Sequence, residues 1–185
     1  MSARSGRHLV QVVLAVVVLS GGLLVEHVEG QSLAVRPFVS TGVVGEPVAA
    51  GAGTVVVHRA RAATELADGL GGLLTTSGVW VAVDLSLTGR DGPATLGALH
   101  LQDATGRQFA ASRRVSLNGL GRAQPGSPIR GEVLFEVPRD AVEQVTLIAS
   151  ELLGPLLSGT ARVPVPVELV QGPLVRAATT LGDPR

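Results

Sequence analysis

The sequence predicts an all-β protein: a two-sheet sandwich of about seven strands, preceded by one hydrophobic helix. Three observations lead to this prediction. Several short stretches alternate apolar and polar residues with a period of two, as half-buried strands do. Clusters of glycine, proline and aspartate separate those stretches. After the N-terminal apolar run, no long amphipathic helical pattern competes with them.

The first element is the uncharged apolar run Leu9–Val25. Arg4 and Arg7 precede it, and Glu26 and Glu29 follow it. A charged group in the bilayer core costs several kcal/mol, so a long run without charge is typical of a membrane-directed segment. Because the basic residues come first, we expect the N-terminus to stay in the cytoplasm and the rest of the chain to cross.

Residues 1–30 are thus a cytoplasmic stub with either a signal anchor or a signal peptide. An uncleaved anchor makes a single-pass membrane protein with its domain outside. Cleavage after Gly30 would place Val28 and Gly30 at the small-residue positions and release a secreted protein. The sequence has no cysteine, which rules out an anchor on a lipid-modified cysteine, a disulfide framework and a disulfide-linked partner.

The remaining chain divides into a linker with a first edge strand over 31–53, a sandwich over 54–170 and a flexible tail over 171–185. The expected elements run, in chain order, as a strand over 54–62, a glycine-rich loop with a short helical turn over 63–78, a strand over 79–88, a turn over 89–93, a strand over 96–102, a hairpin turn over 103–106, a return strand over 107–115, a loop over 118–128, a strand over 129–137, a corner over 138–143, a strand over 145–153 and an edge strand over 161–170.

The strand 129–137 shows how these predictions are made. Its odd-numbered residues are apolar or glycine, which predicts an inward face. Glu132 and Glu136 belong to the other face and are predicted to meet solvent, while Leu134 breaks that polar pattern. In the last strand, Pro164 and Pro166 share one face, and because proline cannot donate to a ladder this strand is predicted to be an edge.

Part of the chain resembles a known family. The stretch VWVAVDLSLTG is followed by LGALHLQDATGRQFAAS, then by the strand and corner Gly126–Asp140, then by VTLIAS. That order is similar to the telokin-like immunoglobulin-fold domains of secreted and membrane-tethered bacterial proteins, over roughly Gly53–Val170. The resemblance implies an immunoglobulin-like sandwich that serves as an extracytoplasmic binding or structural module. It transfers no catalytic motif, and the chain departs from the family's lipoproteins by lacking the lipobox cysteine.

The residues predict no catalytic, cofactor or metal site. There is no G-x-S-x-G, no S-x-x-K and no glycine loop with the G-K-[ST] ending. His58 and His100 lie alone on separate expected strands, and a metal would need them to meet in space with Asp84 or Asp103. We expect both histidines to face solvent.

Two features suggest contact with a partner. Arg113 and Arg114, with Arg122 in the following loop, form a cationic group at one end of the sandwich, where loops commonly carry binding. Trp80 has the parity opposite to the valines of its strand, so it either covers the second face of the sheet under a loop or is exposed as an interface anchor.

The formal net charge is zero, which favours neither nucleic acid nor an anionic surface. The sequence thus predicts a non-enzymatic, extracytoplasmic, membrane-tethered immunoglobulin-like module for protein–protein contact, such as an accessory subunit of an envelope or transport complex. Its partners would be the membrane, through residues 9–25, and a protein of the cell envelope. The alternative is a secreted β-sandwich that binds a small molecule or an ion.

Overall fold

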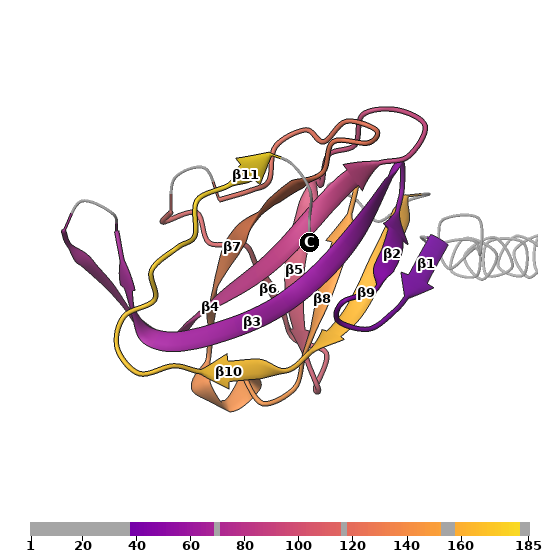
Figure 1. Cartoon of the computed structure of the whole chain (residues 1–185). Coiled ribbons are helices and arrows are strands. Elements are labelled where there is room, and N and C mark those ends of the chain that lie inside the picture. The colour runs from indigo at the N-terminus through magenta and orange to yellow at the C-terminus, as the bar shows by residue number, and fades with distance from the viewer. Residues whose placement is uncertain (1–37, 69–70, 116–117, 153–157, 182–185) are drawn as a thin grey trace, which may run out of the picture. The chain divides into compact units, whose positions relative to one another are not determined.

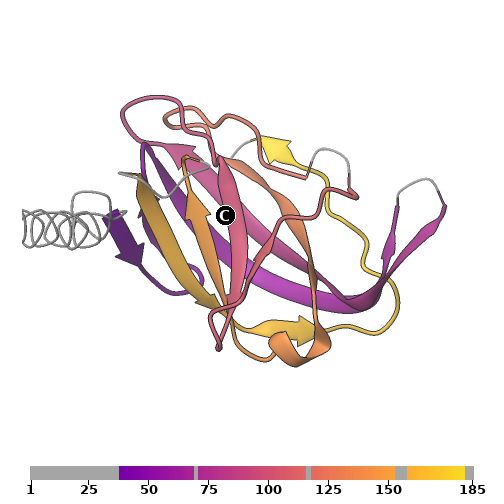
Figure 2. The ribbon, with the colours of Figure 1, turned by 180° about the vertical axis from the view of Figure 1, so that it is seen from behind.

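Two β-sheets pack face to face around an apolar core (Figures 1 and 2). The structure is a computed structural model that describes residues 38–68, 71–115, 118–152 and 158–181. The prediction of an all-β sandwich is confirmed. Within the described residues the chain forms eleven strands, more than the seven or so expected, because several short strands have only two to four residues.

Sheet A has one parallel pair, and its other pairs are antiparallel. Its strands are, in spatial order, β1 (Phe38–Thr41), β9 (Gly159–Val165), β8 (Val145–Ser150), β5 (Ala98–Asp103) and β6 (Gln108–Ala110).

Sheet B is built around two long antiparallel strands, β3 and β4. Its strands are, in spatial order, β10 (Val167–Leu169), β3 (Gly53–Ala67), β4 (Leu73–Gly89), β7 (Ile129–Val137) and β11 (Thr180–Leu181), and β2 (Pro47–Ala50) also pairs with β3. A short 3-10 helix, η2 (Arg139–Ala141), follows β7 in the corner expected there.

The core between the sheets follows the period-two alternation read from the sequence. On β4, the five odd-numbered residues from Val79 to Leu87 face the core, and on β7 the odd-numbered side chains of Ile129, Val133, Phe135 and Val137 do the same. Sheet A contributes the alternate residues Leu99, Leu101, Leu147, Ala149, Ala161, Val163 and Val165. β-Branched and leucine side chains fill both inner faces, as such sheets favour.

The expected glycine-rich loop over 63–78 is wrong. β3 runs on to Ala67 and β4 begins at Leu73, so the two strands continue beyond the end of β7 as a two-stranded arm (Figure 1). Leu66 on the arm is buried although it precedes the glycines, because Leu174 of the C-terminal segment lies beside it. This tertiary contact overrides the local preference for a loop.

The segment 171–181 is not the tail that the sequence predicts. It crosses the outer face of sheet B, and we call it the strap. The Leu174 amide donates to the Glu65 carbonyl, and the Leu174 carbonyl accepts from the Ala67 amide, each at 2.8 Å. At its end, β11 pairs with β7 through Thr180 and Arg130.

The strap covers a second apolar cluster on the outer face of sheet B. Trp80, Ala82 and Leu134 form its floor, and Leu174 closes it from above. Leu134 breaks the polar pattern of β7 because this face carries a cluster of its own. The expectation that Glu132 meets solvent is wrong for a related reason: its side chain is 0% exposed beneath the strap.

The chain passes from sheet A to sheet B near the two prolines of the last strand expected from the sequence. β9 ends at Val165 in sheet A, and β10 begins at Val167 in sheet B, so Pro166 is the crossing point. The Arg162 carbonyl points toward β1 and accepts a hydrogen bond from the amide of Gly42, the residue after β1, at 3.2 Å. Peptide groups alternate along a strand, so Pro164 faces the same side, past the end of β1. The Pro164 nitrogen, which carries no hydrogen, therefore faces a free edge, where no hydrogen bond of the ladder is lost.

No helix among the described residues is long and apolar enough to cross a membrane. The run Leu9–Val25 lies outside those residues, as do the expected cleavage site near Gly30 and the N-terminal helix. Their membrane role stays a prediction.

Candidate functional site

The most unusual backbone in sheet B is a bulge in β4 at the root of the arm. Between the Ala63–Trp80 and Glu65–Thr75 pairs, β3 contributes the single residue Thr64, whereas β4 contributes the four residues 76–79. Bulges of this kind re-aim side chains and interrupt pairing, and they are common next to functional sites.

Gly78 allows the bulge to pass close to the end of β7. A Cβ on Gly78 would lie 2.1 Å from the Val137 carbonyl oxygen and 3.1 Å from the Pro138 Cα. Both obstacles are backbone atoms that no rotamer change can move. Glycine is required here because of this close approach.

A cleft of about 660 Å³ opens beside the bulge. One wall is the β4 backbone, and the other is the end of β7 with the helix η2. Its lining residues are Thr76, Ser77, Gly78, Phe109, Glu136, Val137, Pro138, Arg139 and Asp140.

Glu136, on the cleft wall, is held as a carboxylate. Burial opposes ionisation, but hydrogen bonds from the Ser112 hydroxyl at 2.7 Å and from Arg114 Nη1 at 2.9 Å outweigh it, so the pKa of Glu136 is lowered. A carboxylate in this state accepts hydrogen bonds at neutral pH and has no proton to donate.

Arg114 connects three parts of the site. Besides its bond to Glu136, its Nη1 donates to the Thr75 carbonyl on the arm at 2.9 Å. Its guanidinium also lies over the Trp80 ring, 5.3 Å from the ring centroid. The indole Nε1 of Trp80 donates to the Leu74 carbonyl at 2.9 Å. These contacts fix the arm against the sheet at the bulge.

A second arginine, Arg107, contacts two residues that line the cleft. Arg107 donates to Asp140 at 2.8 Å and to Asp103 at 2.5 Å, and it lies over the Phe109 ring at 5.9 Å. Each of the two cleft carboxylates, Glu136 and Asp140, is thus neutralised by an arginine that also lies over an aromatic ring.

Asp103 locks the hairpin turn that the sequence predicts at 103–106. The Gly106 amide donates to the Asp103 carbonyl at 3.1 Å, and Gly106 has a φ of 91°. Burial alone would raise the pKa of Asp103, but hydrogen bonds from the side chains and amides of Arg107 and Thr105 lower it to about 2.

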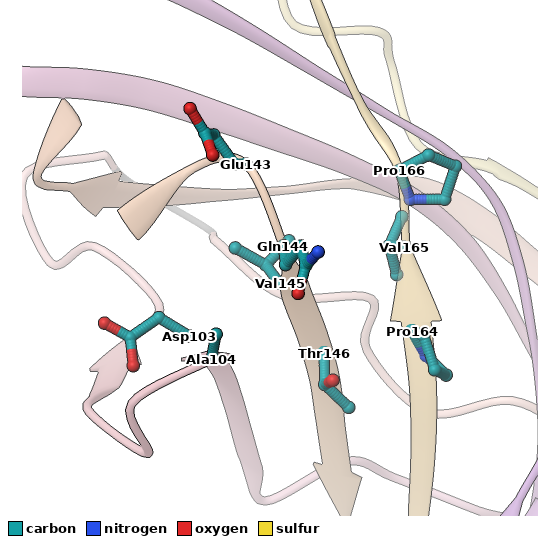
Figure 3. A pocket seen from close by; sticks show the side chains of 9 residues that line it. All are labelled: Asp103, Ala104, Glu143, Gln144, Val145, Thr146, Pro164, Val165 and Pro166. Carbon is teal, nitrogen blue, oxygen red and sulfur yellow. The ribbon is translucent and has the colours of Figure 1, made fainter. Parts of the chain in front are cut away.

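A second, smaller hollow of about 370 Å³ lies beside Asp103 and Ala104 (Figure 3). Figure 3 shows Asp103 and Ala104 on one side of it and Pro164 and Pro166 on the other. The carboxylate of Asp103 is already occupied by the turn.

The four sequence-predicted site residues do not form one patch. Trp80 is buried, which matches the covered position of the two that its parity allowed, and Arg114 binds within the protein. Arg113 is exposed and stands between two residues that contact Glu136. Arg122 lies in the loop that pairs with residues 89–94, at the far end of β4.

Arg139, Asp140, Phe109 and the hydroxyl residues of the cleft were missed in the sequence. The signal that could have found them is Gly78, which stands directly before a clear strand, together with the V-P-R-D corner after β7. Neither feature shows that the two segments meet.

The histidines are apart from the cleft and from each other. His58 belongs to sheet B, where its Nε2 lies 2.7 Å from the Ser86 hydroxyl oxygen, and His100 belongs to β5 in sheet A. Burial and the nearby Arg130 lower the pKa of His58, and Asp84 only partly opposes them. The described residues hold no group of three or more histidine, aspartate or glutamate side chains suited to a metal ion.

No protein-family model and no curated protein match the chain. Among solved structures, the chain is similar to the yjhA protein from Bacillus subtilis, with a TM-score of 0.48 and 12% sequence identity. The alignment covers 65% of this chain and 97% of that one. No function is carried over from this likeness.

Proposed function

We propose that the protein is a non-enzymatic, extracytoplasmic binding module that contacts a partner protein through the cleft at the β4 bulge. One observation carries the proposal: the backbone of Thr76–Gly78 lies outside the ladders of both neighbouring strands, beside the half-buried ring of Phe109. Backbone that is free of a ladder next to an aromatic side chain is a common basis for protein recognition.

The electrostatics of the cleft support binding rather than catalysis. The lowered pKa of Glu136 removes it as a proton donor at neutral pH, and Asp140 is engaged by Arg107. General acid–base catalysis needs a group whose pKa lies near the working pH. Both carboxylates of the cleft form ion pairs with arginines, which fixes the shape of the cleft surface.

We place the domain outside the cytoplasmic membrane and tethered by residues 9–25. The uncharged run behind two arginines supports this placement. We also assign the sandwich to the immunoglobulin-like class, and to the telokin-like domains that the motifs between Gly53 and Val170 resemble. Such domains serve as binding or structural modules.

Site-directed photo-crosslinking of the full chain in its native envelope tests the proposal. A photoreactive amino acid replaces Ser77 in the cleft or, as a matched control, Arg122 at the far end of β4. We expect one defined protein adduct from position 77 and none of the same mass from position 122. Equal labelling from both positions, or recovery of the domain free in the medium without any adduct, would refute the proposal.

The volume of the cleft favours a second candidate, a secreted domain that binds a small molecule. Ligand pockets commonly enclose about 300–1,000 Å³, and the cleft falls in that range. A thermal-shift screen of the secreted protein with small molecules and metal ions would separate the two candidates, because a ligand that binds the native state raises the melting temperature.

A further inference from the structure

We propose that the cleft binds an extended peptide segment that carries acidic side chains, and that this segment pairs with the main chain of Thr76 and Ser77. The inference rests on the proposed function and names the chemistry of the partner. Three independent features of the cleft support it: its backbone, its apolar floor and its unpaired charges.

The main chain of Thr76 and Ser77 is available for strand addition, whereas Gly78 is buried and its amide donates to Thr76 Oγ1 at 3.4 Å. β7 pairs with β4 only from Val79 onward, and its chain turns away at Pro138 into the helix η2. β3 offers the single residue Thr64 opposite the bulge. Main-chain groups that belong to no ladder can pair with an incoming extended chain, which is how β-augmentation gains its affinity.

A second free edge, on β9, differs from the bulge because it carries a proline. On β9, the position beyond the end of β1 is occupied by Pro164, which has no N–H to offer an incoming strand. The bulge stretch Thr76–Val79 contains no proline. One edge is therefore blocked, and the edge at the cleft is open.

The floor of the cleft suits alternating side chains. Phe109 and Pro138 supply apolar contact, Ser77 adds an exposed hydroxyl group, and the Thr76 side chain is hydrogen-bonded to Glu136. An extended peptide directs successive side chains to opposite faces. Every second side chain would then meet the apolar floor, and the others would point outward to the rim.

The charges at the rim favour acidic residues at those outward positions. Glu136 and Asp140 are each paired with an arginine, so they do not repel an incoming carboxylate strongly. Arg139 lines the cleft, Arg113 lies in the chain between Ser112 and Arg114, which bind Glu136 of the cleft, and both arginines are exposed. Neither makes a hydrogen bond or ion pair within the part of the chain that the structure describes. These two cations complement an acidic segment.

Fluorescence anisotropy with labelled hexapeptides tests this proposal on the full chain in detergent micelles. The probe alternates valine and glutamate. A valine–lysine peptide tests the charge, and a valine–glutamate peptide with one central proline tests the backbone pairing. We expect the first to bind and both others to bind at least about tenfold more weakly.

Protein variants locate the binding site. Arg139→Glu combined with Arg113→Glu should weaken binding of the valine–glutamate peptide by about tenfold or more, whereas Arg122→Glu should leave it unchanged. Circular dichroism of each variant checks the fold. If the valine–lysine peptide binds equally well, or if Arg122→Glu has the same effect, the proposal is wrong.

Two further outcomes separate this inference from its alternatives. If vesicles of anionic phospholipid bind through Arg113 and Arg139 while the peptides do not, the cleft faces lipid and the peptide proposal fails. If position 77 crosslinks to a defined protein but charge reversal leaves that adduct and peptide binding unchanged, the proposed function stands and this inference falls. If no protein adduct forms at all, the proposed function fails whatever the peptides do.

Discussion

The Glu132 carboxylate lies 2.6 Å from the Arg61 guanidinium, beneath the strap. Its second oxygen accepts the Ala177 amide at 2.7 Å, and Arg61 also donates to the Val175 carbonyl at 3.3 Å. A buried ion pair thus joins two strands of sheet B to the strap. Burying a charge is unfavourable unless it is paired and hydrogen-bonded, and the strap completes that pairing.

Removing one member of this pair should destabilise the protein strongly. In Glu132→Ala, the Arg61 charge stays beneath the strap without its partner, and we expect the free energy of unfolding to fall by about 3 kcal/mol. Urea denaturation measures the change. Glu143→Ala, which removes an exposed carboxylate, is the control and should change stability by less than about 0.5 kcal/mol. Equal effects of the two variants would show that the ion pair does not hold the strap.

Leu174 should anchor the strap through packing. Its side chain is 1% exposed, and Leu174→Ala should lower the free energy of unfolding by about 3 kcal/mol. Trp80 is the one tryptophan of the sequence, so loosening of the strap should also shift its fluorescence emission to longer wavelength. Leu181→Ala, at a leucine that is 78% exposed, should change neither quantity. An unshifted emission in Leu174→Ala would contradict the described packing.

The lowered pKa of Asp103 predicts a pH dependence of stability. Well above the unfolded pKa, from about pH 5 upward, the carboxyl is ionised in both the native and the unfolded chain, so its stabilisation is fully present. As the pH falls, the unfolded chain takes up the proton first, and the stabilisation declines until the pH has passed below the native pKa of about 2. The stability difference between wild type and Asp103→Asn should therefore be largest at neutral pH and shrink as the pH falls from about 5 through about 2. Denaturation series at several pH values measure it, and a constant difference would contradict the hydrogen bonding described for the turn.

Gly78→Ala tests whether the bulge needs glycine. The new methyl group would meet the backbone of Val137 and Pro138, so we expect a loss of stability of about 1–3 kcal/mol. Gly92→Ala is the matched control, because a Cβ there meets no atom within 4 Å and its φ is not positive. Thermal unfolding compares the two variants. If both melt alike, the close approach at the bulge is not as described.

Period-two alternation was enough to predict the sandwich and its inner faces. The strands over 79–88 and 129–137 carry alternation that depends only on neighbours in sequence, and the structure follows it. The D-A-T-G turn was predictable for the same local reason. The strap was not predictable, because the sequence of residues 171–181 does not indicate that Leu174 packs in the cluster with Trp80. Nor does it indicate that the Ala177 amide donates to Glu132.

The candidate site was predicted only in fragments. Arg114 binds Glu136 of the cleft and Arg113 precedes it in the chain, but Arg122 lies in a loop at the far end of β4. The sequence pattern placed both loops at an end of the sandwich without showing that they are at opposite ends. Trp80 had the correct parity for the outer face, yet parity does not say what covers a face. The bulge joins segments that are about sixty residues apart, and single-sequence patterns do not report such contacts.

The exchange of the chain between sheets at Pro166 has a consequence for the order of folding. β9 pairs in parallel with β1, and β10 pairs in parallel with β3, so one continuous stretch adds a strand to each sheet through contacts between distant parts of the chain. Such contacts carry the largest loop-closure entropy and tend to form late. Since only Pro166 separates the two strands, ordering one of them brings the other close to its own sheet. We therefore expect both sheets to close in a single late step, without an intermediate in which one sheet is finished and the other is not.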